Sequence, residues 1–184
     1  MKNTIPALCA LLLATSTLRA DDAAGTSWWE SWKADLRATW NSREHAIMIP
    51  FNTYHVRGTY DNDRLKQFNE MPWGLGVERH YTDELRNRHS LYVLVFSESY
   101  SKPQPAVGYA WEKNIFLNNT RTARVGLGFN AMLTGRYKSN YFPLPGATPT
   151  FSVNYRCYSV QTTWVPYLGR NDGNVFLTMF KVSI

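Results

Sequence analysis

Short runs of about ten residues, separated by turn residues, fill most of this chain and limit the folds open to it. Within several runs apolar and polar side chains alternate, which is the period of a β-strand with two unlike faces. The run 174–184 places Phe176 and Phe180 on one face and Met179 and Lys181 on the other. The pattern therefore predicts an all-β fold of repeated antiparallel strands.

The number and length of the runs favour a barrel that crosses a membrane. They lie near 46–60, 72–82, 88–100, 105–116, 122–136, 149–156, 157–167 and 174–184. Eight strands of ~9–11 residues, the length that crosses a bilayer when tilted, need only ~72–88 residues. We therefore expect an eight-stranded antiparallel transmembrane β-barrel. A soluble β-sandwich or lipocalin-like barrel is the competing fold.

The segment 27–40 carries the only clear helical pattern. Its apolar residues recur every four positions from Trp28 to Trp40, charged residues take the opposite face, and Ser27 is placed to cap the first turn. A tryptophan-rich stripe opposite charge is typical of an amphipathic helix at a membrane interface. The alternative is a helix packed on a soluble core.

The first twenty residues have the features of an export signal. Lys2 supplies a positive start, 5–13 is an apolar run, and small or polar residues lead to Ala20. Such a segment is too short to cross a bilayer as a helix. We expect residues 1–20 to be a signal peptide, which directs the chain out of the cytoplasm.

The remaining chain is expected to form one outer-membrane domain, 21–184, with the helix at about 27–40 and the barrel at about 46–184. It has 18 basic and 14 acidic residues, a net charge of +4, which is weak for a nucleic-acid partner. No motif for a metal, a nucleotide or another cofactor is present. We expect no cofactor, no nucleic acid and a monomer.

The run 91–96, LYVLVF, departs from simple alternation because it is apolar on both faces. A strand of this kind is normally buried on both sides. In a membrane barrel one face meets lipid, so the other face must line an apolar interior. Since an eight-stranded barrel is just wide enough to hold one ligand, the run suggests a pocket for an acyl chain.

Ordered motifs along the chain connect it to a known family. They are IPFNTYHVRGTYD (49–61), NEMPWGLG (69–76), HSLYVLVFSESY (89–100), VGYAWE (107–112), VGLGFNAMLTGR (125–136), YFPLP (141–145) and NDGNVF (171–176). In this order and near-matching spacing, the chain resembles the PagP family of outer-membrane lipid A palmitoyltransferases over nearly all of its expected mature length.

The resemblance implies an activity, partners and a location. Family members are eight-stranded barrels with an amphipathic helix, and they transfer an acyl chain from a glycerophospholipid to lipid A without a cofactor. The implied partners are the glycerophospholipid donor, the lipid A acceptor and surrounding lipids in the outer membrane of a Gram-negative bacterium. A non-catalytic, lipid-binding outer-membrane barrel is the alternative.

The resemblance also implies a catalytic site. The family's essential histidine corresponds to His55, and its Asp-Ser pair corresponds to Glu98 and Ser99. Imidazole suits a general base near neutral pH, a carboxylate can orient it, and serine can act as a nucleophile or donor. Glu98 replaces the family's aspartate. Arg57 and Arg136 could contact lipid phosphates or the amphipathic helix, or they could lie in solvent.

Two further features of the family map onto single positions. Ala110 stands where the family has a glycine at the floor of the acyl pocket, so the preferred chain is expected to be palmitoyl or somewhat shorter. Pro50 and Pro72 match one lateral gate for lipid, and Pro149 and Pro166 match the other. Because proline lacks a ladder donor, it loosens strand pairing locally. The alternative is that these prolines merely end strands.

Overall fold

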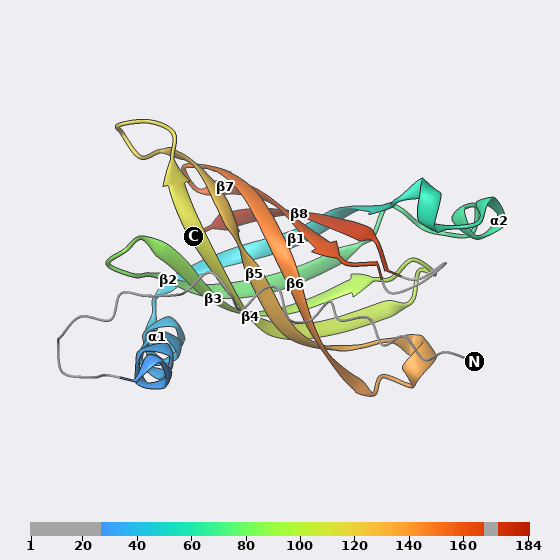
Figure 1. The fold of residues 1–184 in the computed structure, drawn as a ribbon, viewed down its shortest axis with the longest axis horizontal. Helices are drawn as coiled ribbons and strands as arrows, with labels where there is room; N and C mark the ends of the chain where they lie inside the picture. Colours follow the sequence, from blue (N-terminus) through green and yellow to red (C-terminus); the bar gives the residue numbers. More distant parts are fainter. Residues whose placement is uncertain (1–26, 168–172) are drawn as a thin grey trace, which may run out of the picture.

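The computed structural model describes residues 27–167 and 173–184 and shows a closed barrel preceded by a helix (Figure 1). All eight strands pair antiparallel in sequence order, and the last closes on the first. The strands are β1 (Glu44–His55), β2 (Gly74–Thr82), β3 (Asn87–Ser97), β4 (Pro103–Phe116), β5 (Ala123–Gly135), β6 (Pro143–Tyr155), β7 (Tyr158–Val165) and β8 (Val175–Ser183). The expected all-β barrel is confirmed. The expected signal peptide lies outside the described residues.

The connections at the two ends of the barrel differ in length. We call the end with connections 56–73, 98–102, 136–142 and 166–174 the loop end, and the end with connections 83–86, 117–122 and 156–157 the turn end. The loop end carries the short elements η1 (Arg57–Thr59), α2 (Asn62–Leu65) and η2 (Tyr137–Ser139). Figure 1 shows α2 and the N-terminal helix at opposite ends of the molecule.

The helix α1 (Trp28–Asn41) begins after Ser27, whose hydroxyl accepts from the Trp29 N–H, as the capping pattern predicted. It packs beside the turn end (Figure 1). The Trp32 ring lies edge-on to the Tyr109 ring, with centroids 6.2 Å apart. Arg79 donates to the Trp40 carbonyl oxygen, which ties the end of the helix to β2. No helix among the described residues is long and apolar enough to cross a membrane.

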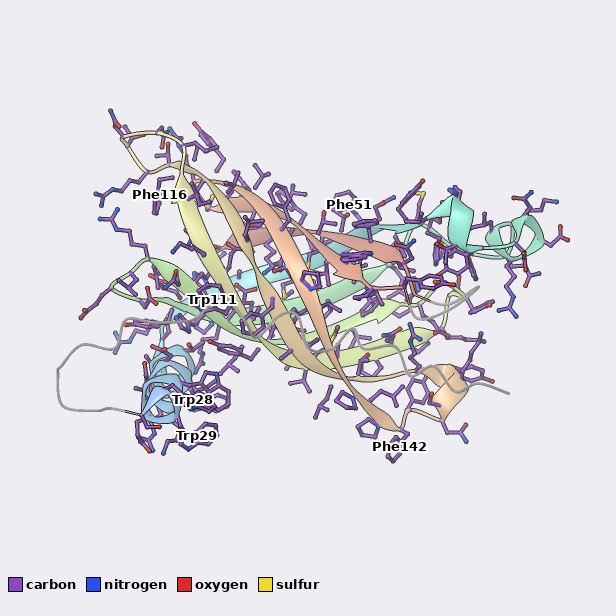
Figure 2. All side chains as sticks on the ribbon, viewed as in Figure 1. Trp28, Trp29, Phe51, Trp111, Phe116 and Phe142 are labelled. Atoms are coloured by element: carbon purple, nitrogen blue, oxygen red, sulfur yellow. The ribbon has the colours of Figure 1, made fainter. Side chains whose placement is uncertain are left out.

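The strands present an apolar surface outward. Large apolar and aromatic side chains are exposed on β1 to β7, among them Phe51, Val93 and Leu127, whereas the apolar side chains of β8 are only partly exposed or buried. Figure 2 shows Phe51 and Phe142 pointing away from the barrel, and Trp28 and Trp29 on the helix beside it. An exposed apolar band with aromatic side chains is the surface of a barrel surrounded by lipid. The prediction of an outer face that meets lipid agrees with this surface on β1 to β7.

The interior has an apolar half on the side of the loop end. On β3, Tyr92 and Leu94 are buried inside while Val93 and Val95 are exposed outside, so the doubly apolar run has the two environments expected of it. The inward residues join an apolar cluster with others across the barrel. Its members are Met48, Tyr92, Leu94, Ala106, Ala110 and Met179, with Phe96, Met132 and Leu177 packed against them.

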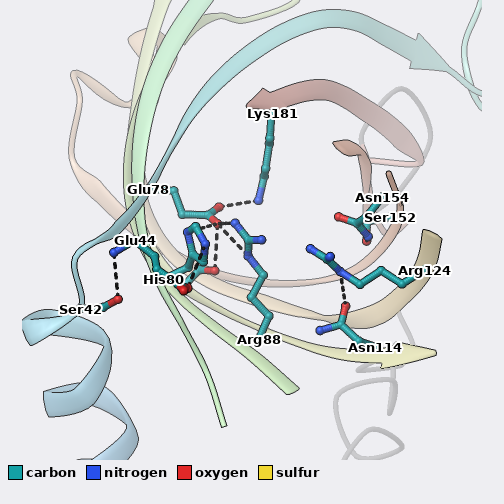
Figure 3. A network of polar contacts seen from close by, with 11 residues as sticks. Ser42, Glu44, Glu78, His80, Arg88, Asn114, Arg124, Ser152, Asn154 and Lys181 are labelled. Atoms are coloured by element: carbon teal, nitrogen blue, oxygen red, sulfur yellow. Dashed lines mark hydrogen bonds and ion pairs between the residues drawn. The ribbon is translucent and has the colours of Figure 1, made fainter. Parts of the chain in front are cut away.

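The half of the interior nearer the turn end is polar and charged (Figure 3). The Glu78 carboxylate, which is fully buried, accepts from Arg88 Nη2 at 2.6 Å and from Lys181 Nζ at 2.5 Å. Ser90 also donates to it, and His80 lies nearby. Two cations and one carboxylate therefore form a compact network inside the barrel. An alternating pattern alone did not predict this network.

The strand β6 differs from the sequence-based expectation. It was expected to begin near 149 but begins at Pro143, and it pairs with β5 along its whole length. Alternate residues direct their N–H groups to opposite neighbours, so Pro143, Pro145 and Pro149 all lack donors on one side. Since the pairing with β5 is intact, the side without donors faces β7. The strand thus tolerates three prolines.

Candidate active site

His55 is the last residue of β1 and lies at the loop end. Only 1% of it is exposed, because aromatic side chains from the connection 56–73 enclose the ring. The Phe68 ring stacks on the imidazole with centroids 4.3 Å apart, and the Tyr60 ring meets it edge-on at 5.3 Å. Tyr60 also donates to the Gly173 carbonyl oxygen, which ties the cluster to the β7–β8 connection. The plane of the imidazole is therefore fixed by packing.

The hydroxyl of Ser99 faces the imidazole from the β3–β4 connection. His55 Nε2 and Ser99 Oγ are 2.8 Å apart, a hydrogen-bond distance, although 44 residues separate them in the sequence. A base within this reach of a hydroxyl is the arrangement that activates an oxygen nucleophile. The structure thus brings together two of the three residues that the resemblance pointed to.

The carboxylate beside His55 belongs to Glu70, which the sequence analysis did not single out. Glu70 Oε1 lies 3.3 Å from His55 Nδ1 and accepts from the His55 backbone N–H at 3.2 Å. Arg57 Nη2 donates to the other oxygen, Oε2, at 2.6 Å. The imidazole therefore contacts the serine hydroxyl through one nitrogen and the Glu70 carboxylate through the other. Because Glu70 lies in an irregular connection, no periodicity marks it.

Glu98, the carboxylate expected to complete the site, lies in the tight turn next to Ser99. Its backbone N–H donates to the Lys102 carbonyl at 2.8 Å, and its carbonyl accepts from Ser101 at 2.8 Å. Within the described chain its buried oxygen Oε1 has no hydrogen-bond partner. The place beside the imidazole is taken by Glu70, so any role of Glu98 is directed elsewhere.

Arg57, for which three roles were open, binds Glu70 at the surface of the loop end. Its guanidinium also lies over the Tyr54 ring, 5.3 Å from the centroid. Burial opposes ionisation of Glu70, but the hydrogen bonds from Arg57 and His55 outweigh it and hold the pKa of Glu70 below its ordinary value. Glu70 is therefore a carboxylate at neutral pH. Arg136 precedes η2 at the same end of the barrel.

A pocket occupies the apolar half of the barrel interior. Its walls include Leu94, Phe96 and Leu177, and Ala110 lies toward its inner limit. Beside Ala110, the Tyr92 hydroxyl donates to Asn130 Oδ1 at 2.5 Å. A second, polar cavity is lined by the same Ala110 together with Arg88, Glu112 and Lys181. Ala110 thus lies at the boundary between the apolar pocket and the charged network.

The four prolines assigned to gates lie beside two gaps in strand pairing. Pairing between β1 and β2 ends at Met48↔Gly76, and Pro50 and Pro72 lie beyond this pair, on the side of the loop end. The pairing between β6 and β7 ends at Thr150↔Thr163, one residue short of Pro149, and Pro166 follows the last residue of β7. Both gaps open toward the loop end. On its opposite edge, β1 pairs with β8, and on its opposite edge β6 pairs with β5.

Comparison with known proteins decides the family of this barrel. A family model described as "Antimicrobial peptide resistance and lipid A acylation protein PagP" matches residues 35–181, which is most of the chain. This chain belongs to the PagP family. The resemblance noted on the ordered motifs is thereby confirmed, and the match extends from the helix to the last strand.

Individual PagP relatives align with most of the chain. A protein named lipid A acyltransferase PagP from Pectobacterium atrosepticum is 38% identical over 172 residues, which is 93% of this chain and 79% of that protein. Proteins of the same name from Laribacter hongkongensis and Sodalis glossinidius are 38% and 33% identical, over 80% and 95% of this chain and 70% and 92% of their own lengths.

Proposed function

We propose that this protein is an outer-membrane acyltransferase that moves a fatty acyl chain from a glycerophospholipid to lipid A. The observation that carries the proposal is the 2.8 Å contact between His55 Nε2 and Ser99 Oγ at the loop end of a barrel with an apolar interior pocket. Membership of the PagP family, whose relatives are named lipid A acyltransferases, supports the same activity.

The reaction is an exchange of one ester for another. The ester bond of the donor breaks, a new ester forms at a hydroxyl of lipid A, and a lysophospholipid leaves. The proton lost by the acceptor hydroxyl ends on the oxygen of the lysophospholipid, so atoms and charges balance without a cofactor. We assign His55 as the base that carries this proton and Ser99 as the hydroxyl that it acts on or through.

The apolar pocket is proposed to hold the acyl chain during transfer. Its walls include the apolar side chains of Leu94, Phe96 and Leu177, and its deep end meets the Ala110 methyl group. Below that methyl lie the charges of Arg88, Glu78 and Lys181, which an acyl chain cannot approach without loss of solvation or pairing. We therefore propose that Ala110 limits the chain to palmitoyl or somewhat shorter.

Lipid is proposed to enter sideways through the two gaps in strand pairing. A gap in the ladder next to Pro50 and Pro72, and another next to Pro149 and Pro166, would let a chain pass between strands without breaking hydrogen bonds. The exposed apolar surface fits a protein surrounded by lipid, and longer loops are typical of the outward end. We propose a monomer in the Gram-negative outer membrane, exported by residues 1–20.

A pair of histidine substitutions on one strand tests the activity and its base. Purified protein in detergent micelles, given phospholipid and lipid A, should produce acylated lipid A by mass spectrometry. His55→Asn should lower the rate by about 10²- to 10⁴-fold with the barrel intact. His45→Asn, at the other end of β1, should leave the rate unchanged. Full activity of His55→Asn would remove His55 as the base.

The same experiment separates the enzyme from a lipid-binding barrel. The native protein, folded and incubated with both lipids, should transfer the chain within minutes to hours. If it binds phospholipid but yields no acylated lipid A under any donor chain length, the acyltransferase proposal fails and the non-catalytic barrel is the better description.

A further inference from the structure

We infer that Glu70 is a positioning residue for the acyl-transfer site and that its carboxylate holds the His55 imidazole with Nε2 directed at Ser99. The inference rests on the proposed function, because it gives a task to a residue next to the proposed base. It assigns to Glu70 the role of orienting carboxylate that the resemblance implied for Glu98. The structural basis is a set of contacts that Glu70 makes on both sides of the site.

The first contacts are with His55 itself. One oxygen, Oε1, lies within hydrogen-bond distance of both the backbone N–H and the Nδ1 atom of His55, at 3.2 and 3.3 Å. Because Glu70 is ionised and only accepts, Nδ1 must carry the proton that points toward it. The other nitrogen, Nε2, is then free of its proton and can accept one from Ser99 Oγ.

The second contacts are made by the backbone of the two-residue segment Asn69-Glu70. The Glu70 carbonyl accepts from the Thr53 N–H on β1 at 2.9 Å, and the Asn69 N–H donates to the Ser99 carbonyl at 2.7 Å. The Asn69 amide also donates to Ser101 at 3.2 Å. The segment therefore joins the strand that carries the base to the turn that carries the hydroxyl.

The position of this segment explains why it is needed. Regular pairing between β1 and β2 stops at Met48↔Gly76, so β2 does not hydrogen-bond to the residues of β1 that lead up to His55. Asn69-Glu70 supplies hydrogen bonds to β1 beyond the gap. A lateral opening and a rigid catalytic histidine can thus coexist on the same strand.

Packing alone leaves one freedom that Glu70 removes. Phe68 stacks on the imidazole and fixes its plane, but a ring rotated by a half-turn about the Cβ–Cγ bond would fit the same slot. Such a flipped ring would present a carbon in place of a nitrogen to Ser99. The charged acceptor at Oε1 selects the orientation and the tautomer in which Nε2 faces the hydroxyl.

The test compares Glu70→Gln with Asp63→Asn in the full-length protein in detergent micelles. Glutamine keeps the size of the side chain but removes the charge, so we expect kcat to fall by about 10²- to 10⁴-fold while KM changes by less than about threefold. Asp63 is an exposed carboxylate of the same connection, and its substitution should leave both constants unchanged. Glu70→Asp should recover part of the loss.

The pH profile distinguishes positioning from a general loss of structure. Among the described residues, the charged and titratable groups that face His55 are Glu70, Arg57 and Tyr60, all from the connection 56–73. Without the Glu70 charge, the imidazolium loses the carboxylate beside it while the Arg57 cation remains. The acidic limb of the kcat/KM profile should therefore move to lower pH in Glu70→Gln.

The outcomes separate this inference from the function on which it rests. A folded Glu70→Gln protein with native kcat and an unmoved pH profile would overturn the role of Glu70 and leave the acyltransferase in place. A barrel that fails to fold in Glu70→Gln and in Glu70→Asp alike would show a purely structural role and also refute the inference. Absence of transfer by the native protein would remove the function itself.

Discussion

The substitution Ala110→Gly tests whether one methyl group sets the length of the acyl chain. Ala110 is buried on β4 and lines both the apolar pocket and the polar cavity below it. Removal of its methyl deepens the pocket by about the size of one methylene. The Lys181 ammonium, bound to Glu78 at 2.5 Å, lies at this same boundary and prevents further deepening.

The size of the expected effect follows from the transfer of one methylene. Burial of a CH₂ group is worth about 0.8 kcal/mol, so a chain longer by one carbon should gain about fourfold in relative kcat/KM. A second added methylene would reach the charged network and should gain nothing. Glycine in a strand also costs roughly 0.5–1 kcal/mol of folding free energy, so a slightly lower melting temperature is expected.

The assay is a competition between donors that differ by single carbons. Phospholipids with acyl chains of odd and even length are mixed, and the acylated lipid A products are counted by mass spectrometry. Ala106→Gly is the matched control, because Ala106 is buried on the same strand and lines the same pocket away from its floor. An unchanged length preference in Ala110→Gly, or the same shift in Ala106→Gly, would refute the reasoning.

Two further predictions concern the stability of the barrel, measured by thermal unfolding in detergent. Glu78→Ala should lower the free energy of unfolding by about 3–5 kcal/mol, because it leaves two buried cations without their carboxylate; a native melting curve would contradict this. Gly128→Ala should lower the free energy of unfolding by about 1–3 kcal/mol, because the added Cβ would lie 1.9 Å from the Trp111 carbonyl oxygen. Gly146→Ala is the control and should leave the stability nearly unchanged, because its Cβ would meet no atom closer than 3.8 Å.

The parts of the fold that follow a local pattern could be predicted from the sequence. The helix begins where Ser27 and the tryptophan spacing indicated, and β5 and β8 begin and end within about two residues of their alternating runs. Where prolines interrupt the pattern, as in the first half of β6, the prediction began too late. The neighbour β5 holds that segment in the sheet, and a single segment contains no information about its neighbour.

The candidate site divides in the same way. His55 and Ser99 could be proposed because they lie in motifs that resemble a family, and the resemblance also drew attention to Glu98. Glu70 also lies in a quoted motif, NEMPWGLG, but the resemblance gave it no role, and it meets His55 only because its connection closes on β1. The buried charge network around Glu78 could not be predicted for a similar reason, since its members come from three strands, β2, β3 and β8.

The sequence by itself determined the kind of protein: alternating strands, an amphipathic helix, an apolar interior and a histidine and serine with the potential for acyl transfer. These properties are local, since each depends on residue types at short spacing. Only the tertiary structure decided which carboxylate faces the histidine, where the apolar pocket ends and where strand pairing stops. Those properties depend on the register of paired strands and on the closure of the barrel, which bring together side chains far apart in the sequence.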